Sequence, residues 1–345
     1  MNPQRDPEVV LGAGAVVPRV SIIMAVHNGA RHIGQAIRSL QTQRFDDLEV
    51  IVVDDGSSDA TREIVGRMAD SDARIRLIAR PASGRPAFPR NDGLEVARGE
   101  YVGFLDHDDF SYSERVGTMV QALDANSDWI AAFHDIDMVD EKGCRLERTL
   151  LQVSGFREKA REHLIAVGPR RFDCGTRFDR FASLYTAGMH TQSVMIARRR
   201  LDFSLVRFDP QFAICDDTDL WIRLSLTGRI GFVDEIHGGY RQHPGSLMTR
   251  RLDLLEDAVR LHEYNFERVA GRFDAATLAE YRRRVGGHHA ALAWYHYDAG
   301  RLRQARAPLR AALRWWNSPE YRRMLRRTYL PQWVMRTLRG LLRRT

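Results

Sequence analysis

Buried strands alternate with helices through the first third of the chain, and this alternation limits the folds available to it. Three short apolar runs, at 20–26, 48–53 and 101–105, have the length and composition of buried strands. Between the first two, residues 30–43 carry apolar side chains at helical spacing. Strands and helices that alternate in this way predict an α/β fold with a parallel-type sheet and right-handed crossovers.

The remaining elements follow from shorter patterns. Residues 129–133 and 192–196 are predicted strands, and 136–148 are predicted to form a hairpin around Asp140-Glu141-Lys142-Gly143. Residues 216–227 form a predicted amphipathic helix, and two short strands are expected at 231–233 and 238–240. Beyond about residue 250 the pattern is helical throughout.

Acidic residues follow two of the predicted strands. Asp54 and Asp55 come after the second run, and Asp106, Asp108 and Asp109 come after the run at 101–105. Ligands of open α/β sheets bind outside the carboxyl ends of the strands, and hard oxygen ligands there suit Mg²⁺ or Mn²⁺ on a phosphate group. The pattern therefore predicts a metal-bridged diphosphate. The alternative is that these residues only form turns and helix caps, which does not account for the paired Asp54-Asp55.

Positive charge is concentrated at the end of the chain. The net charge is +7, yet residues 301–345 contain thirteen Arg and a single Glu, so the rest of the chain is mildly acidic. A basic tail on an acidic body predicts an anionic surface as partner. A nucleic-acid-binding protein is disfavoured, because the tail lacks interleaved aromatic residues and the body is acidic.

The tail also has two faces in helical projection. Residues 328–344 place leucines on one side and arginines on the other, which is typical of helices that lie in a membrane interface. The alternative is a solvated face that packs on the preceding helices. The functional interpretation predicts peripheral contact with an anionic membrane, at the inner face of the plasma membrane.

Further features concern compartment and organisation. Cys144, Cys174 and Cys215 have no metal or redox spacing, which indicates buried thiols in a reducing, cytoplasmic compartment. Residues 290–297 and 305–315 resemble a single tetratricopeptide-like hairpin, which we expect to pack on the body or on a partner. The predicted units are a leader (1–17), a catalytic domain (18–250, with a nucleotide-binding half at 18–125 and an acceptor half at 126–250) and a helical region (251–345).

Several motifs together resemble the family 2 glycosyltransferases. They are VSIIMAVHNGARHIGQAIRSLQTQ, LEVIVVDDGSSDATREIV, SGRPAFPRNDGLEVARGEYVGFLDHDD, CDDTDLWIRLSLTGRIGFV and YRQHPGS, in the family's order over about residues 18–250. The resemblance implies a glycosyltransferase A type, Rossmann-like mixed sheet flanked by helices, here with an all-helical C-terminal extension. It also implies a nucleotide-sugar donor, Mn²⁺ or Mg²⁺ as cofactor, and inversion at the anomeric carbon.

The resemblance also implies roles for individual residues. The nucleotide would contact Val26, Asn28, Asp54, Asp55, Arg90 and Asp106. The metal would be held by Asp106, Asp108 and His243. The general base would be Asp217, with Asp216 and Asp219 as rivals on the same helix. The sequence departs from the family pattern at Val26 (usually Pro), His27 (usually Tyr), His107 (usually a small residue) and Asp216 (usually Glu).

These roles predict transfer of a sugar, from a UDP-sugar in our interpretation, to a hydroxyl of a saccharide or lipid-linked acceptor in cell-surface polysaccharide or glycoconjugate synthesis. The base would take the proton of the attacking hydroxyl, and the metal would neutralise the departing diphosphate. Two other classes remain open. A phosphoryl-transfer or phosphatase-like enzyme would leave Asp54-Asp55 and Asp217 without roles. An inactive nucleotide-sugar-binding scaffold is disfavoured by the intact set of acidic residues.

Overall fold

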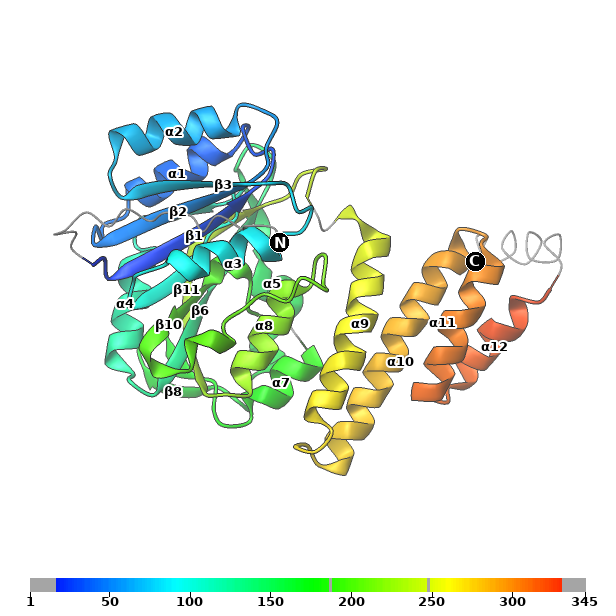
Figure 1. The fold of residues 1–345 in the computed structure, drawn as a ribbon. Coiled ribbons are helices and arrows are strands. Elements are labelled where there is room, and N and C mark those ends of the chain that lie inside the picture. The colour runs from blue at the N-terminus through cyan, green and yellow to red at the C-terminus, as the bar shows by residue number, and fades with distance from the viewer. Residues whose placement is uncertain (1–16, 186–187, 247–248, 331–345) are drawn as a thin grey trace, which may run out of the picture.

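A computed structural model of the protein describes residues 17–185, 188–246 and 249–330. The predicted leader (1–17), apart from its last residue, and most of the predicted two-faced tail (328–344) lie outside these residues. A mixed sheet with helices on both faces forms one part of the molecule, and a row of helices extends from its side (Figure 1). The predicted α/β fold with a helical C-terminal extension is confirmed.

The helices and strands have the following bounds. The strands are β1 (Val20–Val26), β2 (Leu48–Asp55), β3 (Ile75–Arg80), β4 (Tyr101–Phe104), β5 (Phe110–Ser111), β6 (Trp129–Val139), β7 (Arg145–Thr149), β8 (Ile165–Gly168), β9 (Arg171–Asp173), β10 (Val194–Ala197) and β11 (Arg229–Arg241). The α-helices are α1 (Ile33–Gln41), α2 (Thr61–Ser71), α3 (Ala87–Val96), α4 (Arg115–Ala125), α5 (Leu150–Ser154), α6 (Phe156–Lys159), α7 (Phe178–Tyr185), α8 (Asp216–Ser225), α9 (Arg251–Val269), α10 (Ala275–Asp298), α11 (Leu302–Trp315) and α12 (Pro319–Arg327). Short 3₁₀ turns are η1 (Thr191–Ser193), η2 (Arg198–Arg200) and η3 (Phe203–Leu205).

Strand direction determines which loops meet at one edge of the sheet. The order is β3-β2-β1-β4-β10-β6-β11-β9-β8, and β3, β2, β1 and β4 are parallel. Strand β10 lies between β4 and β6 and is antiparallel to both. The segment that leads into β10 therefore lies beside the carboxyl end of β4. Strand β11 also ends there, since its Gly238 and Gly239 pair with β5 just after the acidic turn.

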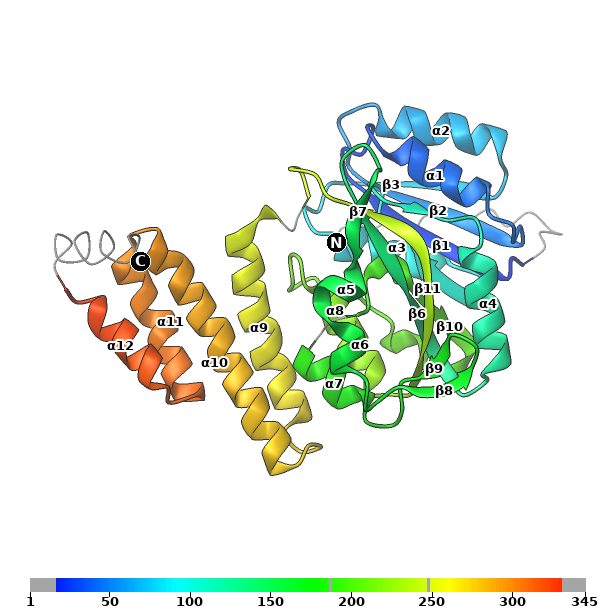
Figure 2. The same ribbon diagram turned by 180° about the vertical axis from the view of Figure 1, so that it is seen from behind.

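Two hydrophobic clusters cover the two faces of the sheet. Side chains alternate along a strand, so Ile22 and Met24 of β1 pack with α1, α2 and α4, whereas Ile23 packs with α3 and α8. Helices α1, α2 and α4 are visible on the rear face in Figure 2. Burial on both faces explains why β1 and β2 have nearly continuous apolar sequences.

Two local expectations were wrong. The predicted short strands at 231–233 and 238–240 are one strand, β11, which pairs with β6 through register shifts at Val233/Ile236 and Ile236/Gly239. Polar residues at this bulge interrupt the apolar pattern without ending the strand.

The second concerns a thiol. Cys144 is exposed rather than buried, because it lies in the turn of the β6–β7 hairpin, where its N–H donates to Asp140.

The C-terminal helices are attached to the sheet-bearing part through α9 and α10. Asp257 of α9 accepts hydrogen bonds from the backbone N–H groups of Ala213 and Ile214, just before α8. Tyr185 of α7 donates to Glu280 of α10 at 2.9 Å. Helices α10 and α11 pack against each other as a helical hairpin, and α10 also contacts α9 and α7. Helix α10 begins at Ala275, well before the hairpin predicted from residue 290. Within the described residues, no helix combines the length and apolar character needed to span a membrane.

Candidate active site

Four of the predicted nucleotide-binding residues lie together at the ends of β1 and β2. Val26 is buried and pairs in register with Asp54. Asn28 adopts a left-handed backbone conformation (φ 52°), and its side-chain oxygen accepts from the N–H of Ser58 at 2.8 Å. The turn after β1 is thereby fixed to the turn after β2.

Asp54 and Asp55 are both buried and both accept hydrogen bonds from several groups. Asp54 accepts from the N–H of Ser57 and from Arg62. Asp55 accepts from the side chain of Arg80, from the N–H and hydroxyl of Ser83 (3.0 and 2.8 Å), and from the N–H of Gly84 (3.3 Å). In this structure the carboxylate of Asp55 therefore holds the loop after β3.

Arg90, on α3, connects the two halves of the site. One terminal nitrogen donates to both oxygens of Asp216, at 3.1 and 2.9 Å, and the other donates to Asp106 at 2.9 Å. Burial alone would lower the pKa of Arg90, but the charges of Asp216, Asp106 and Asp217 raise it well above its ordinary value. Arg90 therefore stays a cation and holds the start of α8 beside the acidic turn after β4.

The three carboxylates at the start of α8 have different surroundings. Asp216 is 1% exposed, and both its oxygens face Arg90. Burial raises the pKa of Asp216 to about 7 against the opposing charge of Arg90. Asp219 is buried against Arg223 (2.7 Å) and Arg268 (3.0 Å), so it serves to join α8 to α9.

Asp217 is the only one of these three that is partly exposed. One oxygen accepts from the N–H of Thr218 at 2.6 Å, and the other accepts from the hydroxyl of Thr191 at 2.8 Å. The hydroxyl of Thr218 also donates to the first oxygen, at 3.2 Å. Three neutral donors from two threonines thus fix the orientation of Asp217, without an Arg or Lys partner among the described residues. Of the three carboxylates, Asp217 has the surroundings that a general base requires.

Asp108 and His243, both predicted metal ligands, lie in direct contact. The Nε2 atom of His243 is 2.8 Å from a carboxylate oxygen of Asp108. Burial works to raise the pKa of Asp108, but His107 and His243 nearby leave it below its ordinary value. The backbone carbonyl of Asp108 accepts from Arg241, which fixes the acidic turn to the end of β11.

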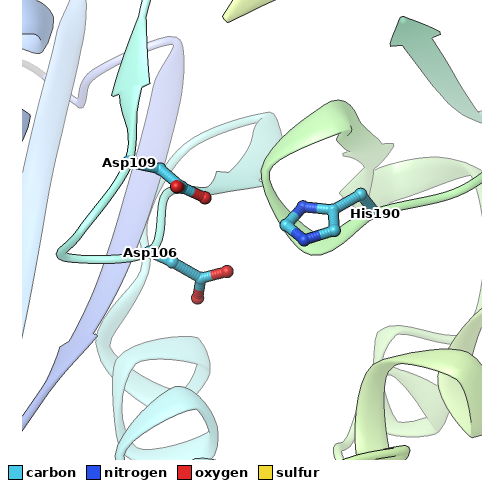
Figure 3. Close-up of side chains that lie close together, drawn as sticks. All are labelled: Asp106, Asp109 and His190. Atoms are coloured by element: carbon cyan, nitrogen blue, oxygen red, sulfur yellow. The ribbon is translucent and has the colours of Figure 1, made fainter. Parts of the chain in front are cut away.

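A second group of potential ligands lies at the same edge (Figure 3). Asp106, Asp109 and His190 each offer an atom within 4.8 Å of the others. Asp109 is 1% exposed and accepts from the backbone N–H of Arg241 and from the side-chain amide of Gln192, both at 2.8 Å. Burial, together with the charges of Asp108 and Asp106, raises the pKa of Asp109 well above its ordinary value.

The segment His190-Thr191-Gln192 was missed by sequence reasoning. His190 lies beside Asp106 and Asp109. Thr191 donates a hydrogen bond to Asp217, and Gln192 donates one to Asp109. The only local signal was that the segment runs into a predicted strand, which begins at Gln192. Its place in the site depends on β10 running antiparallel to β4, which no local pattern reveals.

The arrangement provides hydrogen-bond acceptors at two neighbouring strand ends, oxygen and imidazole ligands for a hard divalent cation, and a partly exposed carboxylate nearby. Such a set can hold a phosphate-bearing ligand through a metal and remove a proton from a second substrate.

Comparison with known proteins agrees with this chemistry. The model of the family described as "Glycosyl transferase family 2" matches residues 21–196. EpsH of Bacillus subtilis, named as a glycosyltransferase, is 28% identical over 78% of this chain and 73% of its own length. A Campylobacter jejuni protein, the GalNAc(5)-diNAcBac-PP-undecaprenol beta-1,3-glucosyltransferase, is 39% identical over 30% of this chain and only 34% of its own length.

Solved structures share the fold. S. aureus TarS 1–349 in complex with UDP-GlcNAc superposes with a TM-score of 0.60 at 18% identity, covering 86% of this chain and 81% of that one. The mannosyltransferase PcManGT from Pyrobaculum calidifontis, in complex with GDP-Man and Mn²⁺, gives a TM-score of 0.54 at 19% identity, covering 90% of this chain and 79% of its own. The expected glycosyltransferase A type fold is thereby confirmed.

Proposed function

The chain belongs to glycosyl transferase family 2 and is a glycosyltransferase, and from this premise we propose that it is metal-dependent and inverting. It would move a sugar from a nucleotide-sugar to a hydroxyl of a saccharide or lipid-linked acceptor. The observation that carries this proposal is the double contact of Arg90 with Asp106 and Asp216. This contact holds α8, and with it Asp217, beside the acidic strand end.

In the proposed reaction Asp217 is the general base. It takes the proton of the acceptor hydroxyl while the hydroxyl oxygen forms a bond to the anomeric carbon. The bond from that carbon to the diphosphate oxygen breaks on the opposite face, and the nucleoside diphosphate leaves with the electron pair. Base catalysis of this kind contributes typically about 10²–10⁴-fold. Asp216 would act through Arg90 as a positioning residue, because its oxygens are buried against the guanidinium.

The residues of the acidic turn fit a divalent metal. Asp106, Asp108 and His243 would hold Mn²⁺ or Mg²⁺; the Asp108–His243 contact of 2.8 Å brings two of these three ligands together. When bound, such an ion neutralises charge on a leaving diphosphate. Support comes from PcManGT, a protein of the same fold whose structure contains Mn²⁺.

We propose a UDP-sugar as donor, as in the TarS complex with UDP-GlcNAc. The base and ribose would meet Val26, Asn28, Asp54, Asp55, Arg90 and Asp106. Asp55 would then exchange one of its present donors, Ser83 or Gly84, for an N–H of the base. Opening of the loop after β3 is therefore part of the proposed binding step. The domain division at about residue 250 belongs to the same proposal.

We also place the protein in the cytoplasm, in peripheral contact with an anionic membrane. The C. jejuni relative has a lipid-linked substrate in its name. The described start of the predicted contact segment, residues 328–330, adjoins α11 and α12. Exposed arginines of these two helices make no ion pair within the described residues. They are Arg303, Arg310, Arg314, Arg322, Arg323, Arg326 and Arg327.

Liposome co-sedimentation tests the membrane contact. The full chain should bind anionic vesicles at low salt and less at high salt, and a chain that ends at Arg327 should bind more weakly. Equal binding by both chains, or no binding by the full chain, would contradict it.

A panel of nucleotide-sugars, with and without Mn²⁺, tests the activity. We expect slow metal-dependent release of nucleoside diphosphate from one donor class, because water can replace the acceptor. Release of inorganic phosphate instead would support the phosphatase-like alternative. Donor binding without turnover, even with candidate saccharide acceptors added, would support an inactive scaffold.

A further inference from the structure

Three side chains from distant parts of the sequence converge at the carboxyl end of β4. Asp106 and Asp109 belong to the turn after this strand, and His190 precedes η1 (Figure 3). Their nearest oxygen and nitrogen atoms all lie within 4.8 Å of one another. Two metal–ligand bonds of roughly 2.1 Å place opposite ligand atoms about 4 Å apart, so small side-chain rotations would bring these atoms to ligand distance.

The two carboxylates have acceptor capacity to spare. Asp106 uses one oxygen for Arg90, and no donor among the described residues reaches the other. Asp109 is buried and accepts only from neutral donors, the N–H of Arg241 and the amide of Gln192. The guanidinium of Arg241 is directed instead to Asp108, Glu141 and Gln35. A buried carboxylate without a directly bonded cation is costly, and a bound cation removes that cost.

His190 and Gln192 also have polar atoms without partners. The Nδ1 atom of His190 is buried and has no hydrogen bond within the described residues, while its ring packs on Tyr240 with the centroids 4.6 Å apart. Gln192 is fully buried, its amide nitrogen bonds to Asp109, and its oxygen likewise has no partner there. A buried polar atom without a partner costs roughly 1–3 kcal/mol, so such atoms indicate a missing ligand or water.

We propose that His190, together with Asp106 and Asp109, ligates a divalent transition-metal ion. The proposal rests on the proposed function only in that a divalent ion takes part. It adds a nitrogen ligand from the segment before β10 to the motif-based set of Asp106, Asp108 and His243. A nitrogen ligand is accepted more readily by Mn²⁺ than by Mg²⁺, which prefers oxygen.

The position of His190 has a consequence for the base. The next residue, Thr191, donates its hydroxyl to Asp217 at 2.8 Å. Fixing His190 on a metal would therefore fix the same short segment that orients Asp217. Binding of the metal to His190 would therefore also help to orient Asp217, through the neighbouring Thr191.

Electron paramagnetic resonance with Mn²⁺ alone, on the full chain, tests the proposal. The pulsed spectrum of bound Mn²⁺ shows ¹⁴N modulation when an imidazole nitrogen is a ligand. We expect this modulation in the wild-type protein and in H243Q, where His190 is the remaining imidazole ligand, and its loss in the double variant H190Q/H243Q. We also expect H190Q to weaken Mn²⁺ binding by roughly tenfold or more. Removal of a residue that only supports a metal ligand already weakens binding by about that much, and loss of a ligand should cost at least the same.

Two further variants serve as controls. H190D/H243Q keeps a metal ligand at position 190 but removes the nitrogen, so it should bind Mn²⁺ without ¹⁴N modulation even if H190Q/H243Q folds poorly. H296Q, on α10 of the helical region, is the matched control and should behave as wild type.

Loss of the modulation in H243Q, or its retention in H190Q/H243Q, would overturn the proposal. Failure of the wild-type chain to bind Mn²⁺ would also overturn it. A chain that binds Mn²⁺ through His190 but transfers no sugar would instead refute the proposed function and leave this inference standing.

Discussion

Replacement of the two adjacent carboxylates at the start of α8 should reduce turnover to very different extents, strongly for Asp217 and little for Asp216. D217N should remove the general base while leaving the fold intact. If the amide oxygen of Asn stays on Thr218, which donates its N–H at 2.6 Å and its hydroxyl at 3.2 Å, only the hydrogen bond from Thr191 at 2.8 Å is lost. Because Asp217 is partly exposed, the loss of stability should stay near the roughly 1 kcal/mol of one net hydrogen bond.

The effect on turnover should be much larger. Loss of a general base lowers the rate by about 10²–10⁴-fold, which corresponds to about 3–5 kcal/mol on the barrier. D216N should behave differently, because both oxygens of Asp216 face Arg90 and only 1% of the residue is exposed. No acceptor hydroxyl can reach them, so we expect turnover within about tenfold of wild type, a change of no more than about 1.4 kcal/mol.

Donor turnover and thermal unfolding, measured side by side for wild type, D217N and D216N, distinguish these cases. Donor affinity should be near normal in D217N. An active D217N beside a folded but inactive D216N would refute the assignment and shift the base by one residue.

Other predictions concern the groups around this pair. D108N should abolish transfer and weaken nucleoside diphosphate binding in the presence of Mn²⁺ without unfolding the protein; unchanged Mn²⁺-dependent turnover would remove Asp108 from the site. R90Q should lower the free energy of unfolding by about 3–5 kcal/mol, because Asp216 would lose its buried cation; a urea titration that matches wild type would show that the pair contributes little. T191V should reduce kcat and leave the KM for donor unchanged, whereas T191S, which keeps the hydroxyl, should restore kcat; equal kcat in wild type and T191V would exclude a role for Thr191 in placing Asp217. The pKa of Asp216 is about 7 in the folded protein and 3.8 in its ordinary state, so the folded chain binds more protons than the unfolded chain between these pH values. The free energy of unfolding should therefore fall as pH rises from about 4 to about 7, and D216N should flatten this dependence.

Much of the fold could be predicted because its signals are local. Strands β1, β2 and β4 are buried on both faces, so each is a short apolar run, and helix α1 shows its periodicity in the chain itself. The acidic turn after β4 could be predicted for the same reason, since its residues follow directly on a recognisable strand.

The features that could not be predicted from the sequence depend on contacts between segments that are distant in the chain. Arg90 and Asp216 are 126 residues apart in the chain, so their ion pair has no local signal. His190 and Thr191 reach the site only because β10 is antiparallel to β4, and strand direction is not encoded in a short apolar run. β11 was divided into two strands because a bulge and a broken strand have the same alternation pattern.

The stereochemistry of transfer tests the central proposal most directly. Proton NMR, run early in the reaction with the donor that turns over in the panel, reports the anomeric configuration of the first product. Direct displacement assisted by Asp217 predicts the configuration opposite to that of the donor, so an α-linked donor sugar should give a β product. A product that retains the donor's configuration would contradict the account, because a single displacement from the opposite face cannot produce it.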